Sequence, residues 1–174
     1  MKAIAQFERT LLSYGSKYDR VYCDQEFFED DAVVRGFEVF STEEGDCFHC
    51  HSGIHFTDHS KRNNGLDSFF SDLGLAEVTG NAADEGMFKT PTLRILVFTA
   101  PYMHDGRFQT IDEVIDFYSD GMHNSPTLDP LLRDKHISNG GVQMTAQQKS
   151  DLKAFLLSLT DSAFVNNPAF YSPF

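Results

Sequence analysis

The feature that most constrains this chain is the pentad Cys47-Phe48-His49-Cys50-His51. Cys-x-x-Cys-His is the attachment sequence for a covalently bound c-type haem. On one turn of helix the two thiols lie on the same face, where each can add to one vinyl group of the porphyrin edge. His51 is then held beneath the macrocycle as the proximal iron ligand. The pentad therefore predicts one covalent haem c, bound by Cys47, Cys50 and His51.

Two other chemistries use a similar pair of cysteines. A thioredoxin-like dithiol follows a strand in a βαβ pattern and is not normally closed by histidine. Zinc is the stronger alternative, because His55 and His59 follow the cysteines at a knuckle-like spacing. Zinc knuckles that bind nucleic acid belong to basic chains, whereas this chain has 26 Asp and Glu against 14 Lys and Arg. A zinc-stabilised binding module is therefore kept only as the alternative.

Length and composition fit one haem-binding domain. A chain of 174 residues is long enough to bury a core, and 17 Phe with no Trp suit an apolar pocket around a macrocycle. The net charge of −12 argues against nucleic acid and anionic membranes and favours a basic protein partner. No segment is expected to span a membrane. Cys23, outside the pentad, is expected to be a buried and inert thiol.

The first residues bear on the compartment. Residues 1–10 contain no continuous apolar stretch and no small-residue cleavage site, so they are not a signal peptide. Because c-type haem is attached outside the cytoplasm, we expect a periplasmic protein, either a mature or engineered fragment or a chain whose export signal lies on a longer precursor.

Hydrophobic periodicity predicts a mostly α-helical domain with long loops folded over the cofactor. One helix is expected over residues 3–13, ending near Gly15. An apolar stripe over residues 33–40 predicts a second helix, which leads into the haem motif. The polar, Gly- and Asn-rich stretch 55–81 is expected to be an ordered loop along the haem edge.

Two further helices have clear start signals. Thr110-x-x-Glu113 and Thr145-x-x-Gln148 are capping boxes, in which each side chain satisfies a free backbone N–H of the other residue. The apolar residues that follow each box repeat at helical spacing, so each helix is expected to bury one face.

Longer motifs lie beyond the pentad: residues 88–94 (FKTPTLR), 99–106 (TAPYMHDG) and 117–121 (FYSDG), with shorter matches at 5–11 and 56–58. Together they resemble the bacterial di-haem cytochrome c peroxidase family and its methylamine-utilisation (MauG-type) branch. Such proteins resemble two fused cytochrome c domains, an N-terminal one where peroxide reacts and a C-terminal one for electron transfer. This chain resembles the C-terminal half. The resemblance implies a lead-in helix and linker at 1–30, the haem domain at 31–165 and a C-terminal extension at 166–174.

The resemblance also implies a sixth iron ligand. The family position that bears Met in ordinary peroxidases corresponds to Tyr118, and the MauG-type branch carries Tyr there. Helical phase agrees, because Tyr118 shares the inward face of Ile111 and Ile115. A buried, hydrogen-bonded tyrosine is the alternative, in which case Met122, expected to be exposed, or Met103 would be the ligand.

Further site residues are expected, some from the resemblance and others from side-chain chemistry. In the family, carbonyls matching Thr99 and Pro101 help to hold a calcium ion between the haems, so calcium is a candidate cofactor, although two carbonyls alone make a weak site. Lys89 and Arg94 are candidates to pair with haem propionates, and His104 to line the haem edge. The remaining histidines are expected to be solvated or satisfied in loops: His49, His55, His59, His123 and His136.

The function implied by the resemblance is electron transfer by a mono-haem domain of a di-haem peroxidase-like oxidoreductase. The family's peroxide-binding haem and its distal acid belong to the half that the matched residues do not include. We therefore expect no catalytic residue here, and a partner that is either the N-terminal peroxidatic haem domain or a basic redox protein. The enzyme alternative is a self-standing peroxidatic mono-haem protein with a displaceable sixth ligand.

Overall fold

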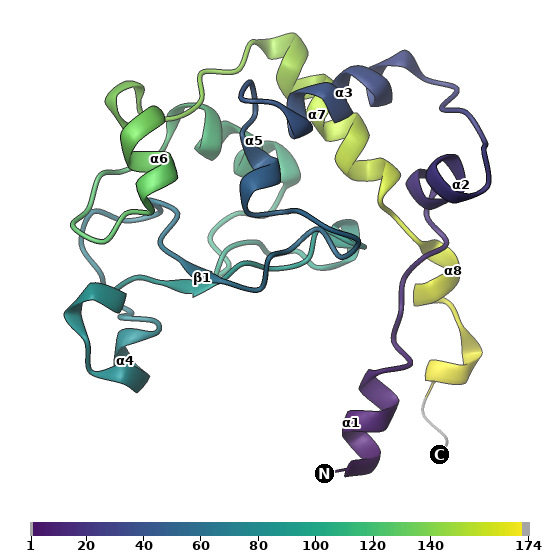
Figure 1. The fold of residues 1–174 in the computed structure, drawn as a ribbon, viewed down its shortest axis with the longest axis horizontal. Coiled ribbons are helices and arrows are strands. Elements are labelled where there is room, and N and C mark those ends of the chain that lie inside the picture. Colours follow the sequence, from purple (N-terminus) through teal and green to yellow (C-terminus); the bar gives the residue numbers. More distant parts are fainter. Residues whose placement is uncertain (1, 172–174) are drawn as a thin grey trace.

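The computed structural model describes residues 2–171 and is mostly α-helical, as the sequence predicted (Figure 1). The helices are α1 (Lys2–Glu8), α2 (Lys17–Cys23), α3 (Asp31–Ser41), α4 (Ala76–Thr79), α5 (Ile111–Asp120), α6 (Pro130–Lys135), α7 (Ala146–Ser158) and α8 (Ser162–Val165). Single 3₁₀ turns are η1 (Cys47–His49), η2 (Ala82–Asp84), η3 (Leu96–Phe98), η4 (Ile137–Asn139) and η5 (Pro168–Phe170). Strand β1 (Lys61–Arg62) pairs antiparallel with β2 (Phe88–Lys89). Within residues 2–171 no helix is long and apolar enough to cross a membrane.

Helices α3 and α7 form the most closely packed pair, although they are far apart in the sequence (Figure 1). Gly36 makes this approach possible, because a Cβ there would lie 1.9 Å from the backbone oxygen of Asp151. Next to it, the Arg35 guanidinium forms a bidentate ion pair with Asp151, with N–O distances of 2.8 and 2.9 Å. The pair buries Phe40 and Phe155 in the main core, so the haem motif that follows α3 starts from a fixed support.

The predicted helix starts are confirmed. Thr110 and Glu113 form a capping box at α5, and Thr145 and Gln148 form one at α7. The stripe over residues 33–40 lies in α3, whose N-cap is Asp30. These signals are local, because each uses side chains three residues apart or one face of a helix.

The first helix is shorter than predicted. It ends at Glu8, whereas the sequence predicted a helix over 3–13. Leu11 and Leu12, which suggested the extra turn, are 37% and 53% exposed in a segment without regular secondary structure and line a pocket described below. The spacing of these two leucines therefore does not reflect a helix.

Helix α2 attaches the N-terminal segment to the rest of the domain. Its capping box pairs Ser16 with Asp19, and both residues are buried. The Arg94 guanidinium donates to both Asp19 carboxylate oxygens at 2.8 Å, and Asp161 accepts hydrogen bonds from Ser13 and the Gly15 backbone. Removing one partner of a buried ion pair typically costs about 3–5 kcal/mol. Part of the expected linker at 1–30 is thus integral to the packed structure.

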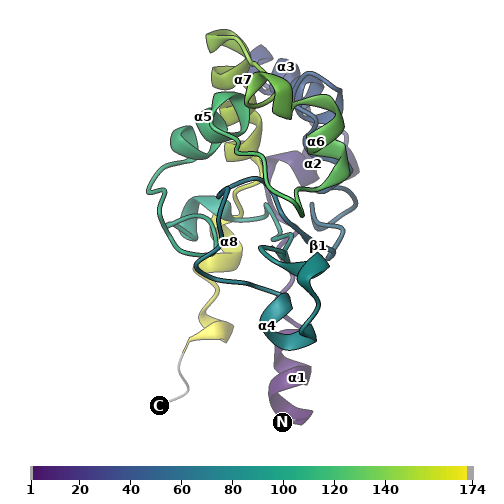
Figure 2. The ribbon, with the colours of Figure 1, turned by 90° about the vertical axis from the view of Figure 1, so that its left-hand side faces the viewer.

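The opposite end of the chain lies beside the first helix. Phe7 in α1 and Phe170 in η5 pack edge to face with ring centroids 6.1 Å apart, and both segments extend away from the helical layer in the two views (Figure 1, Figure 2). Residues 172–174 of the expected C-terminal extension lie outside the described residues.

Among residues 2–171, buried hydrophobic side chains gather in two clusters. The main cluster is built on α3, α5 and α7, and Cys47 and Phe48 of the haem motif pack against it. The second contains Leu66, Phe117 and Met122, and Met103 and Tyr118 pack against it. Two expectations about burial are wrong. Met122 is buried at 5% exposure, and Cys23 is exposed at the end of α2.

Candidate haem-binding site

The haem motif forms a tight turn directly after α3. Asp46 takes up the left-handed conformation (φ 55°) that precedes η1, and the backbone N–H groups of Cys50 and His51 both donate to the Cys47 carbonyl. The Cys47 and Cys50 thiols are unpaired. Burial raises the pKa of Cys47 to about 12 and that of Cys50 to about 11. Both therefore stay protonated, reduced thiols at neutral pH.

His51 is held in the orientation of a metal ligand. Its Nδ1 lies 3.0 Å from the Phe56 carbonyl oxygen. A carbonyl only accepts, so Nδ1 must carry the proton and Nε2 keeps a free lone pair. Burial lowers the pKa of His51, which favours the neutral imidazole. Histidines that bind metals commonly donate their second ring N–H in this way, which fixes the tautomer and the ring.

The loop behind His51 is fixed by a charged network. The Asp58 backbone N–H donates to the Cys50 carbonyl at 2.9 Å, and the Asp58 carboxylate pairs with Arg62 at 2.7 Å. Arg62 also pairs with Asp129, the N-cap of α6, at 2.6 Å. Partial burial would raise the pKa of Asp58, but hydrogen bonds from Arg62 and Ser60 outweigh it and hold that pKa well below its usual range.

Tyr118 and Met103 meet at one amide. The Asn64 side-chain NH₂ donates to the Tyr118 hydroxyl at 3.0 Å and lies 3.7 Å from the Met103 sulfur. Burial raises the pKa of Tyr118 to about 12, partly opposed by the Asn64 hydrogen bond. Asn64 was not singled out in the sequence. Only its place in the polar stretch 55–81 pointed to the haem edge.

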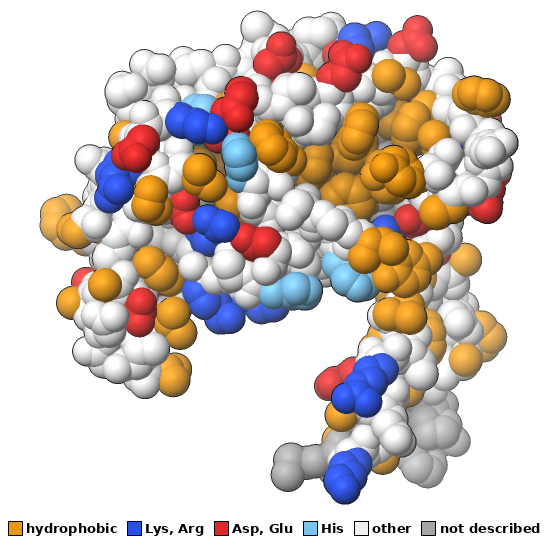
Figure 3. Space-filling model, viewed as in Figure 1, with side chains coloured by type: hydrophobic (Ala, Val, Ile, Leu, Met, Phe, Trp, Pro, Cys, Tyr) orange, Lys and Arg blue, Asp and Glu red, His pale blue; other side chains and the backbone are white. Residues whose placement is uncertain are grey.

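The motif cysteines and Tyr118 lie within electrostatic range of one another. The Cys47 and Cys50 sulfurs are close enough to act electrostatically on the Tyr118 phenol, although they are about 70 residues away in the sequence. On this side of the molecule hydrophobic side chains gather below α3 and α7 (Figure 3). A reduced cysteine pair, an imidazole with a free Nε2 and a facing phenol form a donor set that fits a c-type haem.

Other expected site residues lie elsewhere or have other partners. Arg94 is 4% exposed and bound to Asp19 and the Ile54 carbonyl, so the structure gives its guanidinium a partner other than a propionate. Lys89 is exposed and donates to the Thr90 carbonyl. His104 is exposed and stacks on Phe88 with ring centroids 3.7 Å apart.

The residues of the expected calcium site lie at the surface. Thr99 ends the η3 turn, and both Thr99 and Pro101 are exposed. Their carbonyls come from one short segment, so a calcium ion there would need further oxygen ligands from elsewhere.

The zinc alternative finds no support in the geometry. Among residues 2–171, Cys47, Cys50, His55 and His59 do not come together as one group of candidate ligands. The imidazoles of His55 and His59 are 6.5 Å apart by ring centroid, and His55 contacts the Tyr14 hydroxyl instead. His136 and His49, in contrast, both contact the buried carboxylate of Asp46.

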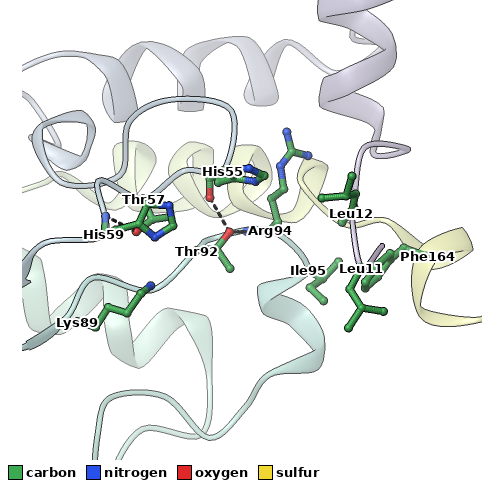
Figure 4. A pocket seen from close by; sticks show the side chains of 11 residues that line it. Leu11, Leu12, His55, Thr57, His59, Lys89, Thr92, Arg94, Ile95 and Phe164 are labelled. Atoms are coloured by element: carbon green, nitrogen blue, oxygen red, sulfur yellow. Dashed lines mark hydrogen bonds between the residues drawn. The ribbon is translucent and has the colours of Figure 1, made fainter. Parts of the chain in front are cut away.

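A pocket of about 330 Å³ lies beside the loop that follows the motif. His55 and His59 line one part of it, with Lys89 and Arg94 nearby, and Leu11, Leu12 and Phe164 form an apolar end (Figure 4). The Thr92 hydroxyl donates to the His55 carbonyl and thereby holds two of its walls together (Figure 4). The pocket therefore lies between the N-terminal segment and the loop that follows the haem motif, and both segments line it.

Comparison with known proteins gives a consistent family. No family model matches the chain. The cytochrome-c peroxidase IdrP1 of Pseudomonas sp. (strain SCT) is 32% identical over 92% of this chain and 49% of its own length. The methylamine utilization protein MauG of Methylophilus methylotrophus is 34% identical over 93% of this chain and 47% of its own length. The chain thus spans about half the length of these relatives.

Solved structures agree with the sequence comparison. A MauG-like protein associated with microbial copper homeostasis superposes with a TM-score of 0.81 and 31% identity, over 92% of this chain and 52% of that one. A variant of the di-haem peroxidase BthA from Burkholderia thailandensis superposes with a TM-score of 0.69 over 87% of this chain and 47% of that one, at 21% identity, and shows likeness of fold alone.

The fold and the donor set define a cytochrome c-type haem domain. By homology over about nine tenths of its length, the chain belongs to the family of MauG and the di-haem cytochrome c peroxidases, as its motifs predicted. Membership of this family implies a haem c cofactor, and the residues around His51 are of the types that bind one.

Proposed function

We propose that this chain is the electron-transfer haem domain of a di-haem cytochrome c peroxidase-like oxidoreductase, corresponding to the C-terminal half of such a protein. It carries one haem c on Cys47 and Cys50, with His51 as proximal ligand and Tyr118 as distal ligand. The observation that carries the proposal is the His51 imidazole, whose Nδ1 donates to the Phe56 carbonyl and which directly follows the unpaired Cys50 thiol in the chain.

The distal residues decide what such a haem does. A phenolate oxygen stabilises ferric iron relative to ferrous, whereas a thioether sulfur does the reverse. The Tyr118 phenol is neutral in the metal-free chain, so ligation to ferric iron replaces its proton. Asn64 keeps the oxygen in position by its hydrogen bond. We expect a six-coordinate haem of low potential that passes one electron at a time.

Peroxide reduction belongs to the rest of such an enzyme. General acid–base assistance typically contributes about 10²–10⁴ in rate. The Tyr118 hydroxyl contacts the amide of Asn64 and its ring packs on Phe117, and neither of these contacts is with an acid. We therefore expect the chain alone to turn over hydrogen peroxide negligibly.

The family and the charge support a setting for this domain. Haem c is attached outside the cytoplasm, which supports a periplasmic location, and a net charge of −12 favours a basic redox partner besides the N-terminal peroxidatic domain. A calcium ion on the Thr99 and Pro101 carbonyls would require oxygen ligands from that other domain.

An absorbance scan and a pyridine haemochrome assay test the proposal. The chain is produced with haem-attachment machinery, and mass spectrometry should find one haem that survives acid-acetone extraction. A haem that extracts completely, or a purified chain with no Soret band and one bound zinc, would overturn it. Peroxide turnover equal to that of complete di-haem enzymes would favour the self-standing peroxidase instead.

A further inference from the structure

A second group of metal-ligating side chains lies on the flank of the haem motif. Glu43, Asp46 and His49 are spaced three residues apart in the turn after α3, and one donor atom of each lies within 4.8 Å of the other two. The His49 Nε2 is 3.1 Å from Asp46 Oδ1 and 3.4 Å from Glu43 Oε1. None of these three side chains has a place in the proposed haem ligation.

The carboxylate of Asp46 sets this group apart from an ordinary surface cluster. Its side chain is only 2% exposed, and its Oδ1 is buried without a hydrogen-bond partner among residues 2–171. A buried carboxylate oxygen that accepts no hydrogen bond is costly, because it has lost its water without gaining a well-aligned donor. The His49 Nε2 and the Lys135 ammonium lie near this oxygen but do not form a hydrogen bond to it. This oxygen points at the place where Glu43 and His49 meet.

The other oxygen of Asp46 is already held. The His136 Nε2 lies 2.7 Å from Asp46 Oδ2, and His136 follows α6 directly. Carboxylates that bind metals are commonly fixed by such an outer hydrogen bond, which orients the ligating oxygen and tunes its basicity. His136 thus leaves Oδ1 as the oxygen available for a cation.

We propose that Glu43, Asp46 and His49 form a binding site for a borderline divalent cation of the zinc class, oriented by His136. Zinc binds carboxylate oxygen and imidazole nitrogen at about 2.0–2.2 Å, which places tetrahedral donors roughly 3.3–3.6 Å apart. The two distances from His49 Nε2 are close to that spacing. Three protein ligands leave the fourth position for water or an exogenous group, so the site is open.

Lys135 competes with the cation. Its ammonium forms an ion pair with Glu43 and lies 3.8 Å from Asp46 Oδ1 and 3.5 Å from His49 Nε2. The ammonium thus lies beside all three donor groups, and a divalent cation must displace it. Lys135 is 36% exposed at the end of α6 and can swing into solvent. Removing it should therefore strengthen binding, which is the opposite of what loss of a ligand does.

Titration with zinc by isothermal calorimetry tests the site. The haem-loaded chain is used, because thioether formation removes the Cys47 and Cys50 thiols that would themselves bind zinc. A Cys23→Ser background removes the exposed third thiol. The expected result is one zinc per chain, with His49→Gln and Glu43→Gln each weakening binding by at least about 10-fold and His136→Gln by a similar factor. Lys135→Ala should tighten binding several-fold.

Matched controls separate the site from general charge. Glu44→Gln removes a neighbouring carboxylate that contacts Gln148 instead, and Lys149→Ala removes a lysine that pairs with Asp116 and Asp120. Neither should change the affinity beyond a small screening effect. Glu43 is exposed and its variant is expected to fold, so the test does not depend on the buried Asp46. Binding that is unchanged by His49→Gln and Glu43→Gln would mean an adventitious ion only and would overturn the proposal.

Discussion

The two sides of the proposed haem site are built in different ways. On the proximal side, Cys47, Cys50 and His51 come from one turn, and the Phe56 carbonyl that orients His51 is only five residues away. On the distal side, Asn64, Met103 and Tyr118 come from three separate segments and meet through one amide. The proximal side is therefore set by local sequence, whereas the distal side exists only after the chain has folded.

This contrast explains which parts of the site the sequence could reveal. The pentad, α3 and the capping boxes at Thr110 and Thr145 are short-range signals, and the structure contains all three helices. The pairing of Arg94 with Asp19 joins residues 75 positions apart. No local pattern could have shown that its guanidinium was already bound.

The largest expected effect comes from breaking the proximal side. Replacing both thiols, Cys47→Ser with Cys50→Ser, should abolish covalent haem, because no thioether can form. Haem staining of a denaturing gel measures this directly. Cys23→Ser is the matched control: that thiol is exposed and outside the motif, so full haem incorporation is expected. Covalent haem in the double variant would contradict the proximal assignment.

The next effect is on the distal side. Tyr118→Phe deletes only the oxygen, so the ferric spectrum and the reduction potential should change strongly, with the potential rising. Stability should fall by only about 1 kcal/mol, the usual net value of one hydrogen bond. Optical spectra and redox titration measure the first two quantities, and denaturant unfolding measures the third.

Tyr102→Phe is the control for that experiment. Its hydroxyl donates to the Leu96 carbonyl at 3.0 Å and its ring packs on the main cluster. A similar loss of stability with an unchanged spectrum is expected. If Tyr118→Phe also left the spectrum unchanged, the distal ligand would be a methionine, and Met103→Leu would then be the variant that alters it.

A smaller effect on the reduction potential is expected from replacing Asn64, whose side-chain amide contacts both candidate distal ligands, Tyr118 and Met103. Asn64→Ala removes the donor to Tyr118 but leaves the phenol in its cluster. The potential should shift by less than in Tyr118→Phe, and the ligand should stay the same, because Asn64 positions the oxygen and does not supply it. Loss of the six-coordinate spectrum in Asn64→Ala would show that the distal side depends on this contact.

The smallest effect concerns pH. The pKa of Asp58 is held below its usual range by Arg62 and Ser60, so folded protein binds this proton less readily than unfolded protein. The resulting stability is present above the unfolded pKa of about 3.9 and is lost as pH falls below it toward the folded pKa. Asp58→Asn should flatten this part of the curve of unfolding free energy against pH. If Asp58→Asn showed the same slope of unfolding free energy against pH, the loss of stability at low pH would be due to other carboxylates.

Errors in the sequence analysis have a common cause. Leu11 and Leu12 repeat at helical spacing, yet they are partly exposed beside a pocket. Met122 follows the polar end of α5, yet it is buried in the second cluster. A hydrophobic residue in the sequence indicates that its side chain makes an apolar contact, but it does not identify the partner. The partner comes from segments that are far away in the chain. Helices α2 and α6 carried start signals at Ser16 and Asp129, but both are short and lack apolar periodicity.

The contact at Gly36 affects how this domain can vary between relatives. Helices α3 and α7 enclose about 100 residues, and that stretch contains every haem ligand proposed here. Closing a chain costs free energy that grows only with the logarithm of its length, about 0.6 kcal/mol for each doubling. Insertions and deletions among the distal segments therefore hardly weaken the helix pair. The distal ligand can therefore be exchanged over evolutionary time while the haem-attachment motif keeps its position at the end of α3.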